Sequence, residues 1–570
     1  MSQHIPAMPD RSSWILPVIP AAQSKAHSLR TTPALLDEIV RVATHGPWLP
    51  TQESLARHEQ LSTPAWFGRD KFGIFTHWGL YTVPEFANEW YSRNLYIQGT
   101  DEFKHQIDTF GAHAEHGYQS FIPLFTAQKF NAHEWLDAFA DAGARYYFPV
   151  AEHHDGFQMY ASRLSHFNAV EMGPKRDIIG ELREATLDHG MHFATSSHRA
   201  EHWWFMSHGM EFDSDIRREA EANTNTERGG NLDGFEYRGL KHGSFYWPAM
   251  PEPASHMDMQ SKPYPSDEYL QDWLMRTCEI IDSYQPEMLY FDWWIGHEAF
   301  KPYVMLMAAY YYNRAAQWGR DVSICYKENA LPWGAGMMDV ERGGYNQAMP
   351  FHWQTDTSIA YNSWDYTSTL EYKPAGEIVR TLINVTSHNG NLLLNVGPRA
   401  DGSLAQKDRD ILHTIGSWMK VNSEAIYDTV AWKESDEGPT PARSGSFNEA
   451  AIDYTSADIR FTSRAGIVYA SVLAPAGGEG AEHLHRSVLP EIITVKAYRE
   501  YRDEDHSPFH GVMRRVSILG DPQNADLPFT RDSEGLHIHV GQALARMRAA
   551  GTLITSGEDV LPVVLRLEEK

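Results

Sequence analysis

The sequence predicts an α/β protein with a (β/α)₈-like barrel followed by an antiparallel β-sandwich. Between about residues 66 and 425, short apolar runs alternate with amphipathic helical patterns, which is typical of a barrel of parallel strands. After about residue 430 the helical patterns stop, and short strand-like runs separated by turn signals follow. The chain has 570 residues, more than one hydrophobic core usually serves, so two or more domains are expected.

Eight apolar runs are candidate barrel strands. A doubly wound open sheet is the main alternative, but such sheets carry a glycine-rich phosphate loop after a strand, and no such loop follows these runs. The candidates are Lys71–Thr76, Arg145–Ala151, His192–Ser197, Met288–Asp292, Val322–Tyr326, Met338–Glu341, Phe351–Thr355 and Asn391–Val396.

Helical patterns lie between several of these strands. Ser266–Tyr284 places its apolar residues on one face at spacings of three and four. Pro174–His189 begins with proline and ends before Gly190, which is the usual asymmetry of helix ends. An amphipathic helix is also expected at Pro33–Ala43, within an N-terminal extension.

These patterns divide the chain into an extension over 1–60, a barrel domain over 61–430 and a β-sandwich over 431–570. The barrel domain contains a polar insert near 206–262, whose central part is too long for an ordinary connection and predicts a lid, a rim loop or a mobile insert. The candidate sandwich strands are Asp458–Thr462, Ile467–Leu473, Val512–Leu519, Leu536–Val540 and Val560–Leu567.

Composition narrows the classes of function. The chain has 75 Asp and Glu against 49 Lys and Arg, so it is a poor candidate for binding nucleic acid, and no apolar run is long enough to span a membrane. Cys278 and Cys325 are predicted to be buried free thiols, which fits a reducing compartment. Because Met1–Arg11 shows no signal-peptide pattern, a cytoplasmic protein is expected. The aromatic content of 12% is compatible with carbohydrate binding.

Titratable side chains follow four of the candidate strands. One strand runs into His77, a second into Glu152-His-His-Asp155, a third into Asp292, and a fourth into Glu341. In a barrel the carboxyl ends of the strands form one rim, where catalytic groups lie. The four endings together therefore predict an active site at this rim.

Two carboxylates on either side of a bond are the usual means of cleaving a glycoside. Asp292, held by an apolar strand and two tryptophans, is a candidate nucleophile, and histidines near it can bind sugar hydroxyls. A lone Asp at a strand end is more often a helix N-cap or an ion-pair partner. His153 and His154 could bind a metal, but neighbours on a regular strand point to opposite faces and no metal-ligand spacing occurs, so no metal is expected.

Longer motifs resemble a known family. Lys71-Phe-Gly-Ile-Phe-Thr-His-Trp-Gly-Leu-Tyr-Thr-Val-Pro84 is followed by Asn88-Glu-Trp-Tyr-Ser-Arg-Asn-Leu-Tyr96 and Glu152-His-His-Asp-Gly-Phe157. Gly173-Pro-Lys-Arg-Asp177 and Asn389-Gly-Asn-Leu-Leu-Leu-Asn-Val-Gly-Pro398 come next. In content and order these motifs resemble those of glycoside hydrolase family 29, the α-L-fucosidases.

The resemblance implies a retaining hydrolase that releases terminal α-L-fucose from a fucosylated oligosaccharide or glycoconjugate through a covalent fucosyl-enzyme, without a cofactor. A homo-oligomer would follow only by analogy. Asp292 matches the family's nucleophile, and Tyr290 precedes it where the family usually has tryptophan. The matching sugar-binding residues are His77, Glu89, His153 and His154, with Trp90 in the same cradle.

The acid/base residue is not fixed by the motifs. Glu341 is preferred because it follows a strand end, and Asp356 and Glu328 are competitors. An arginine that the family usually has after the next strand is not evident, and Lys327 or Glu328 stands nearby.

The strand at His192–Ser197 also departs from the family pattern, because Ser196, Ser197 and His198 occupy positions that often carry tyrosines. This departure and the long insert leave open a hydrolase of a related sugar such as an α-L-galactoside. A catalytically inactive sugar-binding protein is a third alternative, which the presence of Asp292 disfavours.

Overall fold

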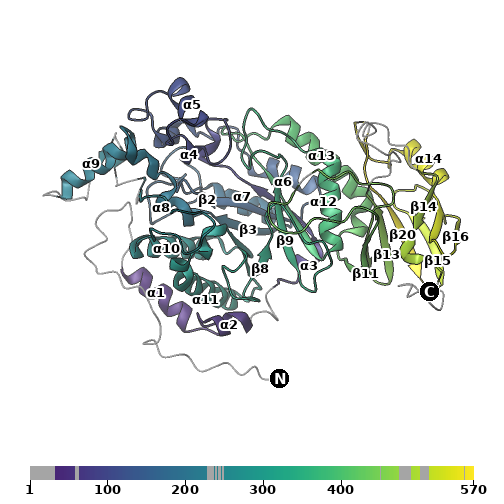
Figure 1. The fold of residues 1–570 in the computed structure, drawn as a ribbon. Coiled ribbons are helices and arrows are strands. Elements are labelled where there is room, and N and C mark those ends of the chain that lie inside the picture. Colours follow the sequence, from purple (N-terminus) through teal and green to yellow (C-terminus); the bar gives the residue numbers. More distant parts are fainter. Residues whose placement is uncertain are drawn as a thin grey trace.

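The computed structural model describes residues 33–57, 63–227, 236–237, 240–241, 245–246, 249–449, 451–473, 490–500, 512–557 and 559–569. Eight parallel strands close into a barrel in the order β1-β10-β9-β8-β7-β6-β3-β2 (Figure 1), which confirms the predicted fold. Each strand lies at a predicted position. They are β1 Phe72–Thr76, β2 Tyr146–Glu152, β3 His192–Ser197, β6 Met288–Phe291, β7 Ser323–Lys327, β8 Met337–Asp339, β9 Trp353–Ser358 and β10 Gly390–Val396.

The barrel strands are apolar because both of their faces are buried. Large side chains such as Phe75, Tyr146 and Leu393 fill the interior. A Cβ at Gly73 would lie 2.0 Å from the ring of Tyr146, so glycine at this position makes room for the ring. The interior is therefore a packed core.

Helices surround the barrel in Figure 1. The predicted helix after Ser266 is confirmed, and the Ser266 hydroxyl caps it by accepting the Tyr269 N–H at 3.2 Å. The prediction that a helix begins at Pro174 was wrong, because Asp177 caps the helix by accepting the Gly180 N–H at 3.0 Å. The helices of this region are α3 Phe67–Asp70, α4 Tyr91–Asn94, α5 Asp101–Thr109, α6 Ala132–Asp141, α7 Ile178–Asp188, α10 Asp267–Tyr284, α11 Lys301–Trp318, α12 Ala375–Ser387 and α13 Gln406–Asn422.

The N-terminal extension packs on the barrel. Its predicted helix is α1, Pro33–Thr44, and a short α2, Gln52–Ala56, follows. The Asn313 amide of α11 donates to the carbonyls of Val42 and Trp48, each at 2.9 Å, and so ties the extension down.

The polar insert begins with short helices that lead into α9, Asp215–Glu227, which projects from the barrel in Figure 1. The pairs β4 Glu236–Tyr237 and β5 Leu240–Lys241 form a two-stranded ladder. Within the stretch predicted as a lid or rim loop, Glu219–Gly243, residues 228–235, 238–239 and 242–243 lie outside the described residues.

The C-terminal region forms two antiparallel sheets around a second core, as predicted. The expectation that helices stop after residue 430 was wrong, because α14, Gly541–Ala550, packs on this core through Ala543 and Leu544. One sheet has the order β11-β12-β13-β20-β15 and the other β14-β17-β16. Their bounds are β11 Val430–Glu437, β12 Ile459–Arg464, β13 Ile467–Val472, β14 Ile492–Val495, β15 Met513–Ile518, β16 Phe529–Arg531, β17 Leu536–His539 and β20 Val563–Glu569, with a small hairpin of β18 Thr555–Ser556 and β19 Asp559–Val560.

The two domains are in contact. In Figure 1 α12 lies between the barrel and the C-terminal sheets, and it packs against β11 and β12. Leu473 and Val564 of the sheets join the core cluster of the barrel. Cys278 and Cys325 are buried and free, as predicted. Among the described helices, none has the length and apolar character required to cross a membrane.

Candidate active site

Asp292 follows β6 at the rim of the barrel. Its Oδ1 accepts the backbone N–H of Trp293 at 2.9 Å, so it does cap a short 3₁₀ helix, Trp293–Gly296. Its Oδ2 lies 3.5 Å from His154 Nε2 and 3.5 Å from His198 Nδ1. Because the side chain is 18% exposed, this second oxygen can be reached by a substrate.

Four histidines lie on one side of Asp292, and we call His77, His153, His154 and His198 the histidine half. The Nδ1 of His77 lies 2.8 Å from Asn395 Oδ1, and the Nδ1–H of His154 donates to the His198 carbonyl at 2.9 Å. Burial lowers the pKa of both His77 and His154 to about 3. These imidazoles are therefore neutral at physiological pH, and each keeps a ring nitrogen for a ligand.

His153 and His154 face the same site. The objection that neighbours on a strand point to opposite faces does not apply, because β2 ends at Glu152 and the ring centroids of the two histidines are 4.3 Å apart. Burial lowers the pKa of His153 as well, and its Nδ1 has no hydrogen-bond partner among the described residues. An unpaired buried donor or acceptor costs free energy, so a ligand that pairs with it is favoured.

Metal-ligating atoms also come together here. One atom each of His77, His153 and His198 lie within 4.8 Å of one another, as do atoms of His154, His198 and Asp292. Neutral imidazoles suit both a transition metal and the hydroxyls of a sugar. The expectation that no metal takes part thus stays a prediction.

Charged groups occupy the other side of Asp292, and we call Lys327, Asp339, Asp356 and Glu341 the lysine half. The Lys327 Nζ, buried at the end of β7, lies 2.5 Å from Asp339 Oδ1, 3.0 Å from Asp356 Oδ1 and 3.4 Å from Glu341 Oε2. Burial alone would lower the pKa of Lys327, but these carboxylates raise it well above its usual value. Of the two residues near the expected arginine, Lys327 is the buried one and Glu328 is exposed.

Asp339 and Asp356 differ in the direction of their pKa shifts beside Lys327. Burial and the neighbouring Asp356 raise the pKa of Asp339 well above its usual value. Burial acts in the same direction on Asp356, but Lys327, Asp339 and the Tyr290 hydroxyl, which donates at 2.9 Å, hold its pKa below its usual value. Asp356 therefore stays ionised, which makes it a poor proton donor.

Glu341 and Asp292 are held by the same tryptophan. The Trp293 indole N–H donates to Glu341 Oε2 at 2.8 Å, while the Trp293 backbone N–H is bound to Asp292. Burial raises the pKa of Glu341 to about 7. Burial would also raise the pKa of Asp292, but His198, whose Nδ1 lies 3.5 Å from Asp292 Oδ2, holds it well below its usual value. Glu341 thus keeps its proton up to about pH 7 while Asp292 is ionised, which is the division required of an acid and a nucleophile.

The other acid/base candidates are less well placed. Glu328, φ +45°, is exposed on the loop after β7. A carboxyl that the acid/base prediction did not include, Glu201, is buried beside His154, with Oε2 3.8 Å from His154 Nδ1. Burial and the charge of Asp292 raise the pKa of Glu201 well above its usual value, so it stays protonated.

The remaining predicted sugar-binding residues occupy different places. Glu89 Oε2 accepts the Trp364 N–H at 3.0 Å, and the Trp364 ring lies 5.2 Å from that of His77, so Glu89 adjoins the histidine half. The Trp90 ring is 6.0 Å from that of His154. Tyr290 is 2% exposed, and its hydroxyl is bound to Asp356 below the site.

Sequence reasoning gave Asn395 no role in the site, and it named His198 and Lys327 only as departures from the family pattern. His198, Asn395 and Lys327 each lie at or just beyond the end of a barrel strand, and that position was the available signal. Glu152 belongs to a family motif, yet its Oε1 accepts from Arg199 at 2.6 Å within a buried ion-pair network, so it supports the site from below.

The chain is similar to known α-L-fucosidases. The family model described as alpha-L-fucosidase matches residues 38–424. The plasma alpha-L-fucosidase of Homo sapiens is 31% identical over 409 residues, which is 69% of this chain and 74% of that protein.

Solved structures share the fold. The alpha-fucosidase of Thermotoga maritima has a TM-score of 0.64 and 24% identity, over 91% of this chain and 100% of that chain. An alpha-L-fucosidase of Bacteroides thetaiotaomicron, solved as a trapped covalent intermediate with 2-fluoro-fucosyl fluoride, has a TM-score of 0.54 and 16% identity, over 90% of this chain and 96% of that chain.

Proposed function

The chain belongs to the α-L-fucosidase family and is a glycoside hydrolase, and we propose that it is a retaining exo-α-L-fucosidase. The proposal rests on two carboxyl groups, Asp292 and Glu341, which are bound by the same Trp293 and differ in their ionisation. Asp292 is ionised and open to substrate, and Glu341 has its pKa raised to about 7 by burial. The enzyme would act on terminal α-L-fucosyl groups of an oligosaccharide or glycoconjugate.

In the first step, Asp292 Oδ2 attacks the anomeric carbon of fucose while the bond to the leaving oxygen breaks. Glu341 gives its proton to that oxygen, and a fucosyl ester of Asp292 forms. In the second step, ionised Glu341 takes a proton from water, which attacks the anomeric carbon and releases fucose and free Asp292. The two inversions leave the anomeric configuration retained.

The histidine half would bind the fucose hydroxyls. Because His154 is neutral and its Nδ1–H is already donated, its Nε2 is an acceptor that faces Asp292 at 3.5 Å. Two acceptors at this separation leave a place for a hydroxyl that donates to one of them. His77 and His153 offer further ring nitrogens, and Glu89 and Trp90 lie next to them.

The proposal is tested with para-nitrophenyl α-L-fucoside, the wild type and Asp292→Ala. The wild type should turn over, while the variant should lose activity by a factor of about a thousand or more because no covalent intermediate can form. Azide should restore part of it and yield fucosyl azide. Substantial activity of Asp292→Ala without azide would overturn the assignment. Dialysis against EDTA should leave the wild type active, and loss of activity would point to a metal at the histidine half.

A related sugar is the second candidate. Ser196 Oγ lies 3.1 Å from His198 Nε2, at positions where the family often has tyrosines, so the sugar contacts on this strand differ. Comparing para-nitrophenyl α-L-fucoside with the α-L-galactoside decides between the two. Activity on neither glycoside, with fucose still bound, would favour an inactive sugar-binding protein.

A further inference from the structure

A loop of the C-terminal region reaches the candidate active site. Residues 441–449, between β11 and β12, run beside the segment that carries Glu341. The Gly445 N–H donates to the Gly344 carbonyl at 2.9 Å, and the Phe447 N–H donates to the Glu341 carbonyl at 2.8 Å. A Cβ at Gly343 would lie 1.9 Å from the Gly445 oxygen, so glycine permits this approach. The loop is thus paired with the backbone of the proposed acid/base.

Glu449 fixes the loop to the barrel. Its Oε1 lies 2.5 Å from the buried Lys373 Nζ and accepts the Thr357 hydroxyl at 2.7 Å. The Glu449 N–H donates to the Arg342 carbonyl at 2.9 Å. The backbone N–H groups of Phe447 and Glu449 are therefore both hydrogen-bonded to the segment that carries Glu341. These two bonds fix the position of Phe447.

Phe447 itself is not explained by packing. Its ring is 58% exposed, although its backbone has φ +54°, in the left-handed region that bulky residues avoid. An exposed aromatic gains little from the hydrophobic effect, and glycine would adopt this φ without strain. Strained backbone that is held by its surroundings is typical of functional sites.

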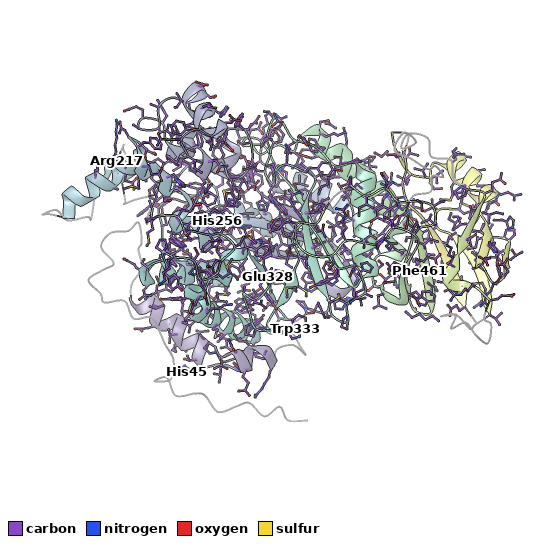
Figure 2. All side chains as sticks on the ribbon, in the orientation of Figure 1. His45, Arg217, His256, Glu328, Trp333 and Phe461 are labelled. Carbon is purple, nitrogen blue, oxygen red and sulfur yellow. The ribbon has the colours of Figure 1, made fainter. Side chains whose placement is uncertain are left out.

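The Phe447 ring lies against Trp293. The two rings are stacked, with centroids 5.7 Å apart and an interplanar angle of 21°. Trp293 in turn binds both Asp292 and Glu341. Trp293 also lines a cavity of about 360 Å³ together with Glu328, Lys301 and Gln260, whose polar groups suit sugar hydroxyls. Glu328 is labelled on the barrel in Figure 2.

We propose that Phe447 and Trp293 form the aromatic surface that binds the sugar on the leaving-group side, so that the C-terminal region supplies a specificity-determining residue. This inference rests on the proposed function. The leaving oxygen must lie beside Glu341 to receive its proton, and Glu341 is held by Trp293 and by the Phe447 N–H. The sugar attached to that oxygen therefore meets the exposed Phe447 and the half-buried Trp293, whose rings suit the C–H face of a hexopyranose.

The test compares two fucosides that both need protonation of the leaving group. One is a fucosyl-hexose disaccharide, which has a second ring, and the other is methyl α-L-fucoside, which has none. Phe447→Gly should lower kcat/KM for the disaccharide by about tenfold, the size of an aromatic contact, and leave methyl α-L-fucoside unchanged. Its Tm should not fall, because glycine relieves the strain at φ +54°.

Two further variants make the result specific. Phe447→Tyr keeps a stacking ring and should retain most of the activity on the disaccharide. Asn448→Ala, which removes only a contact between the Asn448 amide and the Ser444 carbonyl, should change neither substrate.

Equal losses on both fucosides would mean that the loop acts by placing Glu341, and no loss on the disaccharide would mean that the ring does not bind it. Either result overturns the inference. Failure of the wild type on both fucosides overturns the proposed function instead.

Discussion

The histidine half and the lysine half of the site differ in the charge of their side chains. In the histidine half, burial keeps His77, His153 and His154 neutral, and one ring nitrogen, His153 Nδ1, has no partner among the described residues. The lysine half is a closed ion-pair network, in which the Lys327 ammonium lies within 3.4 Å of three carboxyls. Neutral groups with spare nitrogens can bind hydroxyls at little electrostatic cost, whereas a buried network fixes charge for proton transfer. Substitutions should therefore separate binding from stability in one half and combine them in the other.

The largest effect is expected from Lys327→Met. It removes the cation from Asp339 and Asp356, both buried, and breaking such a pair costs about 3–5 kcal/mol. Activity should be lost as well, because the charge that orients Glu341 is gone. Chemical denaturation and kcat/KM measure the two effects.

Lys71→Met is the matched control. Lys71 is also fully buried, but its Nζ has no partner among the described residues and burial lowers its pKa to about 8. Replacing it should leave stability unchanged or raise it. If both variants behaved alike, the ion pairs of Lys327 would not be what stabilises its half of the site.

Glu341→Gln should lower kcat/KM for a fucosyl disaccharide by a factor of about 10²–10⁴. In the wild type, kcat/KM should fall as pH rises through about 7, where Glu341 loses its proton, and this alkaline limb should vanish in the variant. Glu328→Gln and Glu201→Gln are the controls. Glu201 stays protonated, so an amide imitates it and its loss should be small.

Glu341 also links stability to pH. Its folded-state pKa of about 7 lies above its usual 4.5, so its stabilising contribution is present below about 4.5 and is lost as pH rises through about 7. Glu341→Gln should therefore gain stability relative to the wild type between pH 5 and pH 8. If the difference in stability between Glu341→Gln and the wild type were the same at pH 5 and pH 8, the pKa of Glu341 would not be raised.

His153→Phe should separate binding from stability. The phenyl ring keeps the packing on Tyr81 and His154 and removes the unpaired nitrogen, so Tm should not fall. Lost hydroxyl contacts should lower kcat/KM by about tenfold. His113→Phe is the opposite case, because His113 donates to the Leu95 carbonyl at 2.6 Å. His113→Phe should lose stability and keep activity. The comparison would be contradicted if His113→Phe lost activity and His153→Phe lost stability.

The smallest effect is expected from Tyr290→Phe. The Tyr290 hydroxyl is already bound to Asp356, and the ring lies between the two halves, 5.6 Å from that of His198. The variant should lose about 1–3 kcal/mol of stability and change KM by less than about threefold, because no sugar contact is removed. A tenfold rise in KM would instead support the sequence prediction that Tyr290 binds the sugar.

The fold could be predicted because local signals dominate in it. Barrel strands are short runs with both faces buried, and α10 has a serine cap and a long apolar face. The start of α7 was misplaced because the Asp177 cap competes with the proline signal at 174. α14 was missed because its apolar face is short and its stability comes from packing on the C-terminal core.

Most of the candidate site was predicted from residues that follow strand ends, namely His77, His153, His154, Asp292 and Glu341, whereas Glu89 and Trp90 were predicted from a family motif. The roles of these residues stay predictions. The partners that set their protonation, such as Asn395 for His77 and Lys327 for Glu341, depend on contacts between separate strands. Phe447 lies more than one hundred positions after Glu341, and no local pattern connects the two.

The loop that pairs with Glu341 also has a consequence for how the enzyme matures. During synthesis the chain leaves the ribosome from its N-terminus, so Asp292 and Glu341 emerge well before residues 441–449. β1 must wait for β10 to close the barrel, since Phe72 is paired with Leu392. The mouth of the site then waits for the loop, which is held between β11 and β12 of the last domain to fold. A nascent or truncated chain would therefore carry both carboxyls without the proposed leaving-group site, and full activity on oligosaccharides would require the folded C-terminal region.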